Sequence, residues 1–262
     1  MEPKVDGWRM QIEASPEGVR LWTRTQHDAT GKLPMVERQL HKLASFENIS
    51  FRLDGEVVYL DQLGNPDFNF TARCLGSQVD TCVDKQQEGH RWLSFLAFDI
   101  LRYNDLDERG VPLEGRQSDL HDLLGERLAH VFTMPLHVPT ADQHAANVAK
   151  FLEGSVLKDL KSPYPGKRNK AWLKWKAEET VDVVIIGYKP GQGKFSDMIG
   201  SVTFQAPDGT YGNCSGMDDD TREFITKNRS ALKGKWMEVK HYGRLVDGYR
   251  HPQFMRFRFD KE

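Results

Sequence analysis

The sequence predicts an α+β protein of two domains, a larger mixed domain over residues 1–177 and a smaller β-rich domain over residues 178–262. Two observations support this prediction. Strand-like and helix-like patterns alternate up to Lys176, as in a mixed domain. After Lys176 the pattern changes to short strands separated by glycine-containing turns. We therefore place the domain boundary near the polar stretch Ala177–Thr180.

The composition is that of an ordinary globular protein, with 39% hydrophobic and 28% charged residues in a chain of 262. No apolar run reaches the roughly 18 residues that a membrane-spanning helix needs. The first ten residues, MEPKVDGWRM, carry charges and a proline where a secretory signal needs an apolar core. The three cysteines, Cys74, Cys82 and Cys214, form no CxxC pair. We expect reduced thiols in a cytoplasmic protein without a membrane partner.

The first domain begins with a predicted hairpin, in which Val5–Ile12 and Gly18–Thr23 flank the turn Ser15–Gly18. Trp92–Leu101 is a nearly continuous apolar run, as expected of a strand that is buried on both faces. The other predicted elements are helices at Leu33–Leu43, Leu113–His130 and Ala141–Glu153, the last capped by Thr140, and strands at Phe51–Leu60, Gly154–Leu157 and Ala171–Trp175.

The second domain is predicted from strands at Val181–Tyr188, Ile199–Gln205, Tyr211–Cys214 and Trp236–Tyr242, with one helix at Asp218–Lys227. Turns such as Pro207–Asp208–Gly209 separate the strands. About five short strands and one helix in some 85 residues favour a small Greek-key barrel of the OB type.

The net charge of −2 alone argues against a nucleic-acid partner, but the charges are unevenly distributed. Seven basic residues and one acid lie between Lys158 and Lys176, and eight basic and four acidic residues lie between Lys233 and Glu262. Because salt screens charges beyond about 8–10 Å, phosphate binding depends on where the cations gather. Two solvated basic faces would give the same pattern.

A lysine that could act as a nucleophile lies near the start of the chain, in the segment Lys4–Val5–Asp6–Gly7–Trp8–Arg9. Its amine can attack a nucleotide α-phosphate once it has lost its proton, and nearby cations favour the neutral amine. A solvated lysine near a chain end is the plainer explanation of this segment alone.

Acids and lysines recur in three later segments. Glu56 in LDGEVV and Glu153 in EGSVLK offer carboxylates to a hard divalent cation that bridges phosphates. In an extended strand Val156 and Lys158 share one face. In WLKWK we expect both lysines on one side of the strand and both tryptophans on the other.

The ordered series KVDGWR, LDGEVV, FLAFDIL, EGSVLK and WLKWK resembles the motifs of the covalent nucleotidyltransferase superfamily. This superfamily contains ATP-dependent DNA ligases, RNA ligases and messenger-RNA capping enzymes. The resemblance extends from residue 2 to the end of the chain. It implies an ATP-grasp-like nucleotidyltransferase domain, with antiparallel sheets and flanking helices, followed by an OB-fold barrel. It also implies ATP as substrate and Mg²⁺ or Mn²⁺ as cofactor.

The resemblance assigns Lys4 as the nucleophile that becomes adenylylated. It implies that Glu56 and Glu153 serve the metal site, Glu56 also contacting the ribose. The remaining nucleotide contacts that it implies are Glu2 at the adenine amino group, Arg9 and Arg24 near the ribose and the nick phosphate, Phe98 stacked on adenine, Lys158, Lys174 and Lys176 around the phosphates, and Arg168 in the segment Gly166–Lys167–Arg168.

The C-terminal segment Arg250–Lys261 resembles the closing motif of DNA ligases, with its proline–x–phenylalanine and its R-x-D-K. In that family the barrel swings over the nucleotide to orient the ATP pyrophosphate and then swings away to grip DNA. Arg258, Asp260 and Lys261 match the closing positions, and Arg256 is an expected phosphate contact. A plain barrel strand would show the same alternation of aromatic and basic residues.

The resemblance therefore implies a monomeric DNA ligase of the minimal phage-like or bacterial-like form, acting on nicked double-stranded DNA. With the nucleophile at residue 4, either the protein is minimal or the chain lacks native N-terminal residues. An RNA ligase or a capping-type guanylyltransferase shares the first chemical step and remains an alternative. A non-catalytic nucleic-acid-binding protein with an OB barrel is another.

Overall fold

The computed structural model describes residues 1–262 except 126–127, 152, 168, 246 and 262. The chain divides into two compact units, Met1–Trp175 and Lys176–Glu262. The sequence-based boundary, between residues 177 and 178, lies two residues further along the chain.

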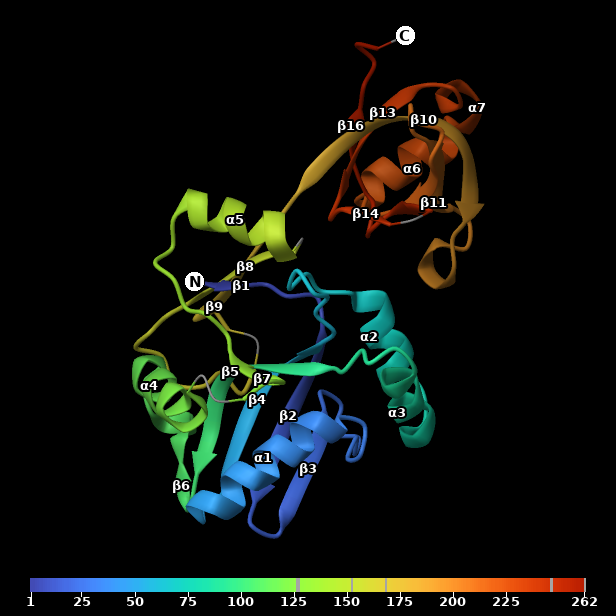
Figure 1. Cartoon of the computed structure of the whole chain (residues 1–262). Helices are drawn as coiled ribbons and strands as arrows, with labels where there is room; N and C mark the ends of the chain where they lie inside the picture. Colours follow the sequence, from blue (N-terminus) through green and yellow to red (C-terminus); the bar gives the residue numbers. More distant parts are fainter. Residues whose placement is uncertain (126–127, 152, 168, 246, 262) are drawn as a thin grey trace. The chain divides into compact units, whose positions relative to one another are not determined.

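The first unit is organised around a six-stranded, mostly antiparallel sheet with the strand order β3-β2-β4-β5-β6 (Figure 1). The short strand β7 adds to β5 in parallel. The strands of this sheet are β2 (Trp8–Ser15), β3 (Gly18–Thr23), β4 (Phe51–Val58), β5 (Ser94–Tyr103), β6 (Leu106–Asp107) and β7 (Val131–Thr133).

The predicted hairpin forms, with Ser15 directly opposite Gly18, but its first strand begins at Trp8 instead of Val5. Strand β5 is buried from Ser94 to Leu101, so the prediction of a strand buried on both faces is confirmed. One carboxylate lies inside this apolar run. Asp99 is fully buried and is neutralised by the equally buried guanidinium of Arg116.

Helices cover one face of this sheet, and Figure 1 shows α1 lying across it. The helices of the unit are α1 (Pro34–Glu47), α2 (Phe68–Leu75), α3 (Val79–Glu88), α4 (Leu113–Leu124) and α5 (Ala141–Phe151), with a 3₁₀ turn at Glu108–Gly110. Residues from α1 to α4 form the main core with the inner residues of β2, β3, β4 and β5. Thr140 caps α5 as predicted, because its hydroxyl accepts from the Gln143 amide at 3.1 Å.

One expectation about these helices was wrong, and two helices were not expected. Helix α4 ends at Leu124 and does not continue to His130, because Gly125 adopts a positive φ of 52° that ends the helix. Helices α2 and α3 were not predicted from the sequence. Each has ten residues or fewer, which is too short to display a clear helical period.

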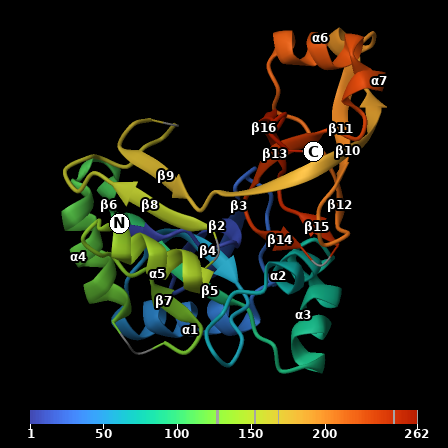
Figure 2. The ribbon, with the colours of Figure 1, turned by 90° about the horizontal axis from the view of Figure 1, so that it is seen from above.

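A second, three-stranded sheet with the order β1-β8-β9 lies on the other side of the unit. Its strands are β1 (Glu2–Pro3), β8 (Gly154–Lys158) and β9 (Trp172–Lys176). Helix α5 lies beside β8 (Figure 2), and His144 and Asn147 of this helix both contact the Ser155 hydroxyl. Side chains from this sheet and from β4 and β5 form a small apolar cluster that includes Phe98 and, at its edge, Trp172.

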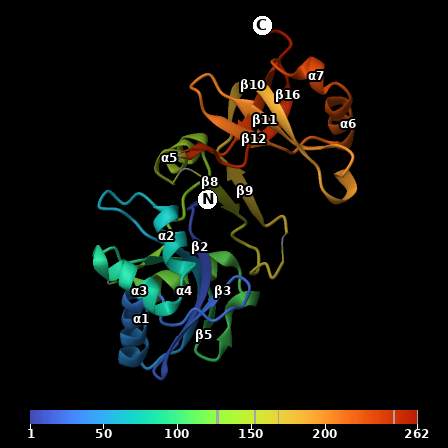
Figure 3. The ribbon, with the colours of Figure 1, turned by 90° about the vertical axis from the view of Figure 1, so that its right-hand side faces the viewer.

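The second unit contains a five-stranded antiparallel sheet with the order β12-β11-β10-β13-β16. The two helices α6 and α7 belong to the same unit (Figure 3), and Ile225 of α6 and Leu232 of α7 are buried in its core. The elements of the unit are β10 (Glu179–Pro190), a 3₁₀ turn at Gly193–Phe195, β11 (Ile199–Gln205), β12 (Tyr211–Cys214), α6 (Asp219–Lys227), α7 (Arg229–Leu232), β13 (Trp236–His241), β14 (Arg244–Leu245), β15 (Gly248–Tyr249) and β16 (Gln253–Phe257).

The mixed α/β character and the antiparallel sheets are confirmed, whereas the predicted OB-type barrel is not confirmed, and no closed barrel is found among the described residues. In the described part of this unit, an isolated parallel bridge joins Ser215, which directly follows the edge strand β12, to Gln253 of the other edge strand, β16. Of the helices that the structure describes, none has both the length and the apolar character needed to cross a membrane.

Candidate active site

A cavity of about 280 Å³ lies between the two sheets of the first unit. Its walls come from five of the predicted motifs and from both sheets. The lining residues are Glu2, Pro3, Lys4, Val5, Arg9, Arg24, Glu56, Phe98, Met134, Val156, Lys158, Trp172 and Lys174. Segments that are distant in the sequence therefore meet around one hollow.

Lys4 is fixed at this cavity by strand pairing. Strand β1 pairs with β8, and the Lys4 amide donates to the Gly154 carbonyl at 2.8 Å. Gly154 has a φ of 115°, which a residue with a side chain adopts only under strain. This backbone turn places Glu153 next to Lys4, and the Lys4 ammonium is ion-paired with the Glu153 carboxylate.

Glu56 is the second carboxylate near Lys4 and enters from β4. Burial raises its pKa to about 8; the charge of Lys4 lowers the pKa, while Asp54 and Glu153 raise it further. Gly7 is needed beside it, because a Cβ on Gly7 would lie 2.5 Å from the Glu56 Cγ and 2.6 Å from the Val57 carbonyl oxygen. The glycine of the first motif thus makes room for the acid of the second.

Glu2 and Lys158 form a buried ion pair at 2.7 Å, with side chains only 3% and 2% exposed. The Lys158 ammonium also donates to the Phe98 carbonyl at 3.3 Å. It lies 4.6 Å from the centre of the Phe98 ring and 4.0 Å from that of Trp172. Burial raises the pKa of the Glu2 carboxyl, and Lys158 opposes this effect. The pair therefore forms a buried polar end of the cavity, beside the rings of Phe98 and Trp172.

Arg9 is held by a second set of partners. Its Nε and Nη2 donate to the two oxygens of the fully buried Asp54 at 3.1 and 2.6 Å. The Tyr164 hydroxyl donates to Asp54 at 2.5 Å and accepts from Arg9 Nη2 at 3.0 Å. Asp54 belongs to the same LDGE segment as Glu56, so this motif supplies one acid to each side of the site.

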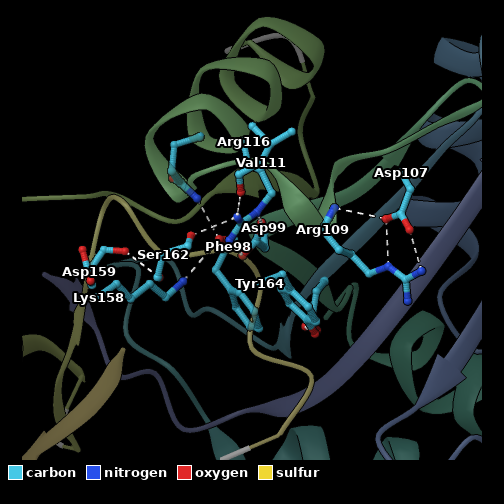
Figure 4. A network of polar contacts seen from close by, with 12 residues as sticks. Phe98, Asp99, Asp107, Arg109, Val111, Arg116, Lys158, Asp159, Ser162 and Tyr164 are labelled. Carbon is cyan, nitrogen blue, oxygen red and sulfur yellow. Dashed lines mark hydrogen bonds and ion pairs between the residues drawn. The ribbon is translucent and has the colours of Figure 1, made fainter. Parts of the chain in front are cut away.

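A network of buried hydrogen bonds and ion pairs lies next to the cavity (Figure 4). Arg116 of α4 donates to both oxygens of Asp99 at 2.6 and 2.9 Å, and its Nη1 contacts the carbonyls of Val111 and Ser162. Phe98, which lines the cavity, directly precedes Asp99 on β5. The network therefore connects β5, α4 and the segment between β8 and β9.

A larger groove of about 880 Å³ continues from the cavity and shares Arg9, Arg24, Trp172 and Lys174 with it. Arg109 and Lys167 add two further cations. The described residues that line this groove include no Asp or Glu. The groove can attract an anionic chain, since its positive charge is concentrated on one surface.

The prediction for the two tryptophans of WLKWK was wrong. Trp172 and Lys174 line the same cavity, because residues two apart share a face of a strand. Trp175 instead stacks on His144 of α5, with ring centres 4.0 Å apart. The spacing of three residues between the tryptophans already required opposite faces.

Most of the site residues expected from the sequence line the cavity. Glu153 is connected to them by its ion pair with Lys4. The lining does not include Lys176, whose ammonium lies 4.4 Å from the centre of the Tyr242 ring. Arg168 lies outside the described residues. In the second unit, Arg256 pairs with Glu238 at 2.6 Å, while Arg258 and Lys261 both contact Asp182. Arg258 also pairs with Asp260 at 2.8 Å.

No role in the site was predicted from the sequence for Trp172, Tyr164, Asp54 or Met134. Trp172 could have been found from its even spacing to Lys174. Tyr164 lies in a polar segment where nothing in the local pattern distinguishes a buried hydroxyl from a solvated one. Its role depends on Arg9 and Asp54, which are more than 100 residues away in the sequence.

Among the described residues, no group of three or more His, Cys, Asp or Glu side chains could hold a metal ion. Two carboxylates nevertheless suit a cation that takes its other ligands from phosphates and water, as Mg²⁺ does. Glu153 also raises the pKa of Glu56, although less strongly than Lys4 lowers it. The donor set at Glu56 and Glu153 therefore fits Mg²⁺ with a bound nucleotide.

The fold and this cavity define the class of covalent nucleotidyltransferases, in which a lysine faces a pocket for a base and its phosphates. Residues 1–176 match the family model of the ATP dependent DNA ligase domain. The chain therefore belongs to the ATP-dependent DNA ligase family.

Named relatives agree with this assignment. A probable DNA ligase of Kineococcus radiotolerans is 32% identical over 235 residues, which cover 86% of this chain and 44% of the relative. The DNA ligase of Haloferax volcanii is 35% identical over 214 residues, covering 79% of this chain and 35% of the relative. The chain spans less than half the length of these curated relatives.

Solved structures share the fold. The ligase domain of M. tuberculosis LigD superimposes with a TM-score of 0.58 at 25% identity, covering 100% of this chain and 89% of that one. A structure from a study of Lig E DNA ligases, titled as DNA binding with a minimal scaffold, gives a TM-score of 0.72 at 20% identity. That alignment covers 98% of this chain and 91% of the other.

Proposed function

We propose that this protein is an ATP-dependent DNA ligase that seals nicks between a 5′-phosphate and a 3′-hydroxyl through a lysyl-AMP intermediate on Lys4. One observation carries the proposal. The Lys4 ammonium is paired with Glu153 at the edge of a cavity that Glu56, Lys158 and Lys174 also line. This arrangement combines a nucleophile, a proton acceptor and cations for a polyphosphate, and simple binding of nucleic acid would not need it.

In the first step Lys4 gives up a proton, for which Glu153 is the adjacent acceptor. The neutral amine attacks the α-phosphorus of ATP, a P–N bond forms, and the bond from the α-phosphorus to the bridging oxygen breaks. Pyrophosphate leaves with the electron pair of that bond. Most of the catalysis comes from positioning and from stabilising charge on the phosphates.

The residues around the cavity divide into a base end and a phosphate end. Phe98 and Trp172 offer aromatic surface for the adenine, and Glu2 offers an acceptor for its amino group. Arg9, Arg24 and Lys174 offer positive charge to the ribose side and the phosphates. Mg²⁺ bound by Glu56 and Glu153 would neutralise phosphate charge and favour the uncharged form of the nearby amine.

The two later steps use DNA. The 5′-phosphate at the nick takes AMP from Lys4, and the 3′-hydroxyl then attacks that phosphate, which joins the strands and releases AMP. We propose that the DNA backbone near the nick binds in the groove lined by Arg24, Arg109 and Lys167. We propose a monomer that works in the cytoplasm on nicked duplex DNA, with Arg256, Arg258, Asp260 and Lys261 as contacts to pyrophosphate or DNA.

We further propose that the second unit is an OB-type barrel. An OB fold is a five-stranded, partly open barrel. The five strands in the order β12-β11-β10-β13-β16 support this, as does the parallel bridge between Ser215 and Gln253 that connects the two edge strands.

Incubation with α-labelled ATP and Mg²⁺, followed by peptide mapping, tests the proposed nucleophile. The wild-type protein should carry one AMP on Lys4, which intact mass also detects. Lys4→Ala should carry none, and Lys4→Arg should fail as well because a guanidinium does not lose its proton at working pH. Lys194→Ala, which alters an exposed lysine of the second unit, should label like the wild type. A full-strength label on Lys4→Ala would refute the proposal.

The substrate is tested by a panel of nicked DNA, nicked RNA and hybrid duplexes with several nucleoside triphosphates. The names of the relatives favour DNA over the RNA ligase and capping alternatives. We expect sealing of nicked DNA with ATP. Transfer of GMP to an RNA end, or sealing confined to RNA, would identify one of the alternatives instead.

A further inference from the structure

Two cations of the closing segment converge on one carboxylate of the second unit. Arg258 Nη1 donates to both oxygens of Asp182, at 2.9 and 3.0 Å, and the Lys261 ammonium contacts the same carboxylate. Asp182 lies on β10, directly opposite Glu238 of β13. The backbone of the segment is also fixed there, because the Arg258 amide donates to the Trp236 carbonyl at 2.9 Å.

The other edge of the Arg258 guanidinium is bound by Asp260, a residue of the same closing motif. Arg258 Nε and Nη2 donate to Asp260 at 2.9 and 2.8 Å. A guanidinium has five N–H groups, and the two carboxylates together contact its Nε and both of its terminal nitrogens. Two positive charges therefore face two negative ones, and the cluster has no net charge left for a phosphate.

These contacts are exchangeable. The Arg258 and Asp182 side chains are 20% and 21% exposed, and Lys261 is 40% exposed. Ion pairs that water reaches contribute little net free energy, so a ligand with more negative charge can displace the carboxylate. Pyrophosphate and the β- and γ-phosphates of ATP carry such charge and prefer the same guanidinium donors.

We propose that Asp182 is an internal competitor for pyrophosphate, which occupies Arg258 and Lys261 until the phosphates of the nucleotide replace it. The inference rests on the proposed role of these two cations as pyrophosphate contacts. Asp260 keeps the guanidinium oriented during the exchange, since it holds the edge that Asp182 leaves free. After the first step, return of Asp182 to the cations would assist the release of pyrophosphate.

The test measures binding of inorganic pyrophosphate to the full chain by isothermal titration calorimetry. Asp182→Asn keeps the shape of the side chain and removes its charge, so it should tighten pyrophosphate binding by about threefold to tenfold. The matched control is Asp208→Asn, which removes the acid of another ion pair of the same unit, the one with Arg244. It should change the dissociation constant by less than about twofold.

A second set of variants separates competition from a general effect of charge. Asp182→Ser should also tighten binding, whereas Asp182→Glu, which retains the carboxylate, should bind as the wild type does. In a background of Arg258→Gln and Lys261→Gln, the change Asp182→Asn should lose its effect, because the cations that it releases are gone. Unchanged or weaker binding in both Asp182→Asn and Asp182→Ser would overturn the proposal.

Failure of the proposed function gives a different result. Pyrophosphate binding does not require transfer of AMP, so the calorimetric comparison stands even if Lys4 takes up no label. If labelling occurs, reversal of the first step by pyrophosphate should show a lower KM for pyrophosphate in Asp182→Asn.

Discussion

The two units hold the cations of the proposed site residues in different ways. In the first unit Lys158 is paired with Glu2 inside the protein, and both side chains are almost completely buried. In the second unit Arg258 and Lys261 are paired near the surface, and Arg256, with 66% of its side chain exposed, pairs with Glu238. Both regions contain cations matched by carboxylates, but the pair in the first unit lies between two sheets and is more deeply buried.

This difference separates a permanent pocket from exchangeable contacts. Removing a charge from water is expensive, so a buried pair persists only while both partners are present. A pair that water can reach keeps part of its solvation whether it is formed or broken. Another anion can therefore replace its carboxylate at a small cost in free energy. The first arrangement suits a residue that must stay in place when the nucleotide enters. The second suits a segment whose partners change during the reaction.

The largest effect that sharpens this comparison is expected from Lys158→Met. The change leaves the Glu2 carboxylate buried without its cation, and it should reduce the free energy of unfolding by about 3–5 kcal/mol at pH 7. Urea unfolding, followed by circular dichroism, measures the loss.

Lys194→Met is the control for this experiment. It removes the lysine of an exposed pair with Asp219 and should change stability by less than about 0.5 kcal/mol. Equal losses in the two variants would mean that burial does not distinguish the two kinds of ion pair.

A smaller effect is expected from Glu56→Gln as a function of pH. Burial raises the folded-state pKa of Glu56 to about 8, above its value in the unfolded chain. Below the unfolded value Glu56 is protonated in both states, and its stabilising contribution is complete. As the pH rises through 8, the folded protein must ionise a buried carboxyl, and that contribution is lost.

Without metal, the wild type should therefore lose about 1–3 kcal/mol relative to Glu56→Gln between pH 5 and pH 9. Unfolding curves of both proteins across this range check the prediction. Mg²⁺ together with a non-hydrolysable ATP analogue should recover part of the loss in the wild type alone. Parallel stability profiles for the two proteins would show that Glu56 ionises at an ordinary pH.

The smallest effect on stability is expected from Arg256→Ala. Its exposed pair with Glu238 should contribute less than about 1 kcal/mol to the free energy of unfolding. If Arg256 contacts a DNA phosphate, the salt dependence of DNA affinity should lose about one unit of slope. Melting curves and binding at several salt concentrations separate these two effects. A destabilisation as large as that of Lys158→Met would contradict the comparison.

Several elements of the fold could be predicted from local pattern alone. The β2–β3 hairpin, the doubly buried β5 and the Thr140 cap of α5 each depend on neighbouring residues, and each was found. Helices α2 and α3 could not be found in this way. Both are short, and they become stable by packing Phe70, Cys74 and Cys82 into a core supplied by distant strands.

The candidate site was predictable as a list of residue types but not as an arrangement. The spacing in EGSVLK predicted that Val156 and Lys158 share a face, and both line the cavity. Nothing in the sequence paired Lys158 with Glu2 or directed the Tyr164 hydroxyl to Asp54, because those partners are more than 100 residues apart. Asp182 is a comparable case, since its partners Arg258 and Lys261 follow it by more than 70 residues.

The sequence by itself determined the order of the motifs, the mixed character of the first unit and the strand-rich character of the second. It did so because alternation, helical period and turn residues act over a few neighbouring positions. Only the tertiary structure decided which carboxylate meets which cation, and whether that pair is buried or accessible to water. Those choices depend on how the sheets pack, and burial then sets the pKa of Glu56 and the strength of each ion pair.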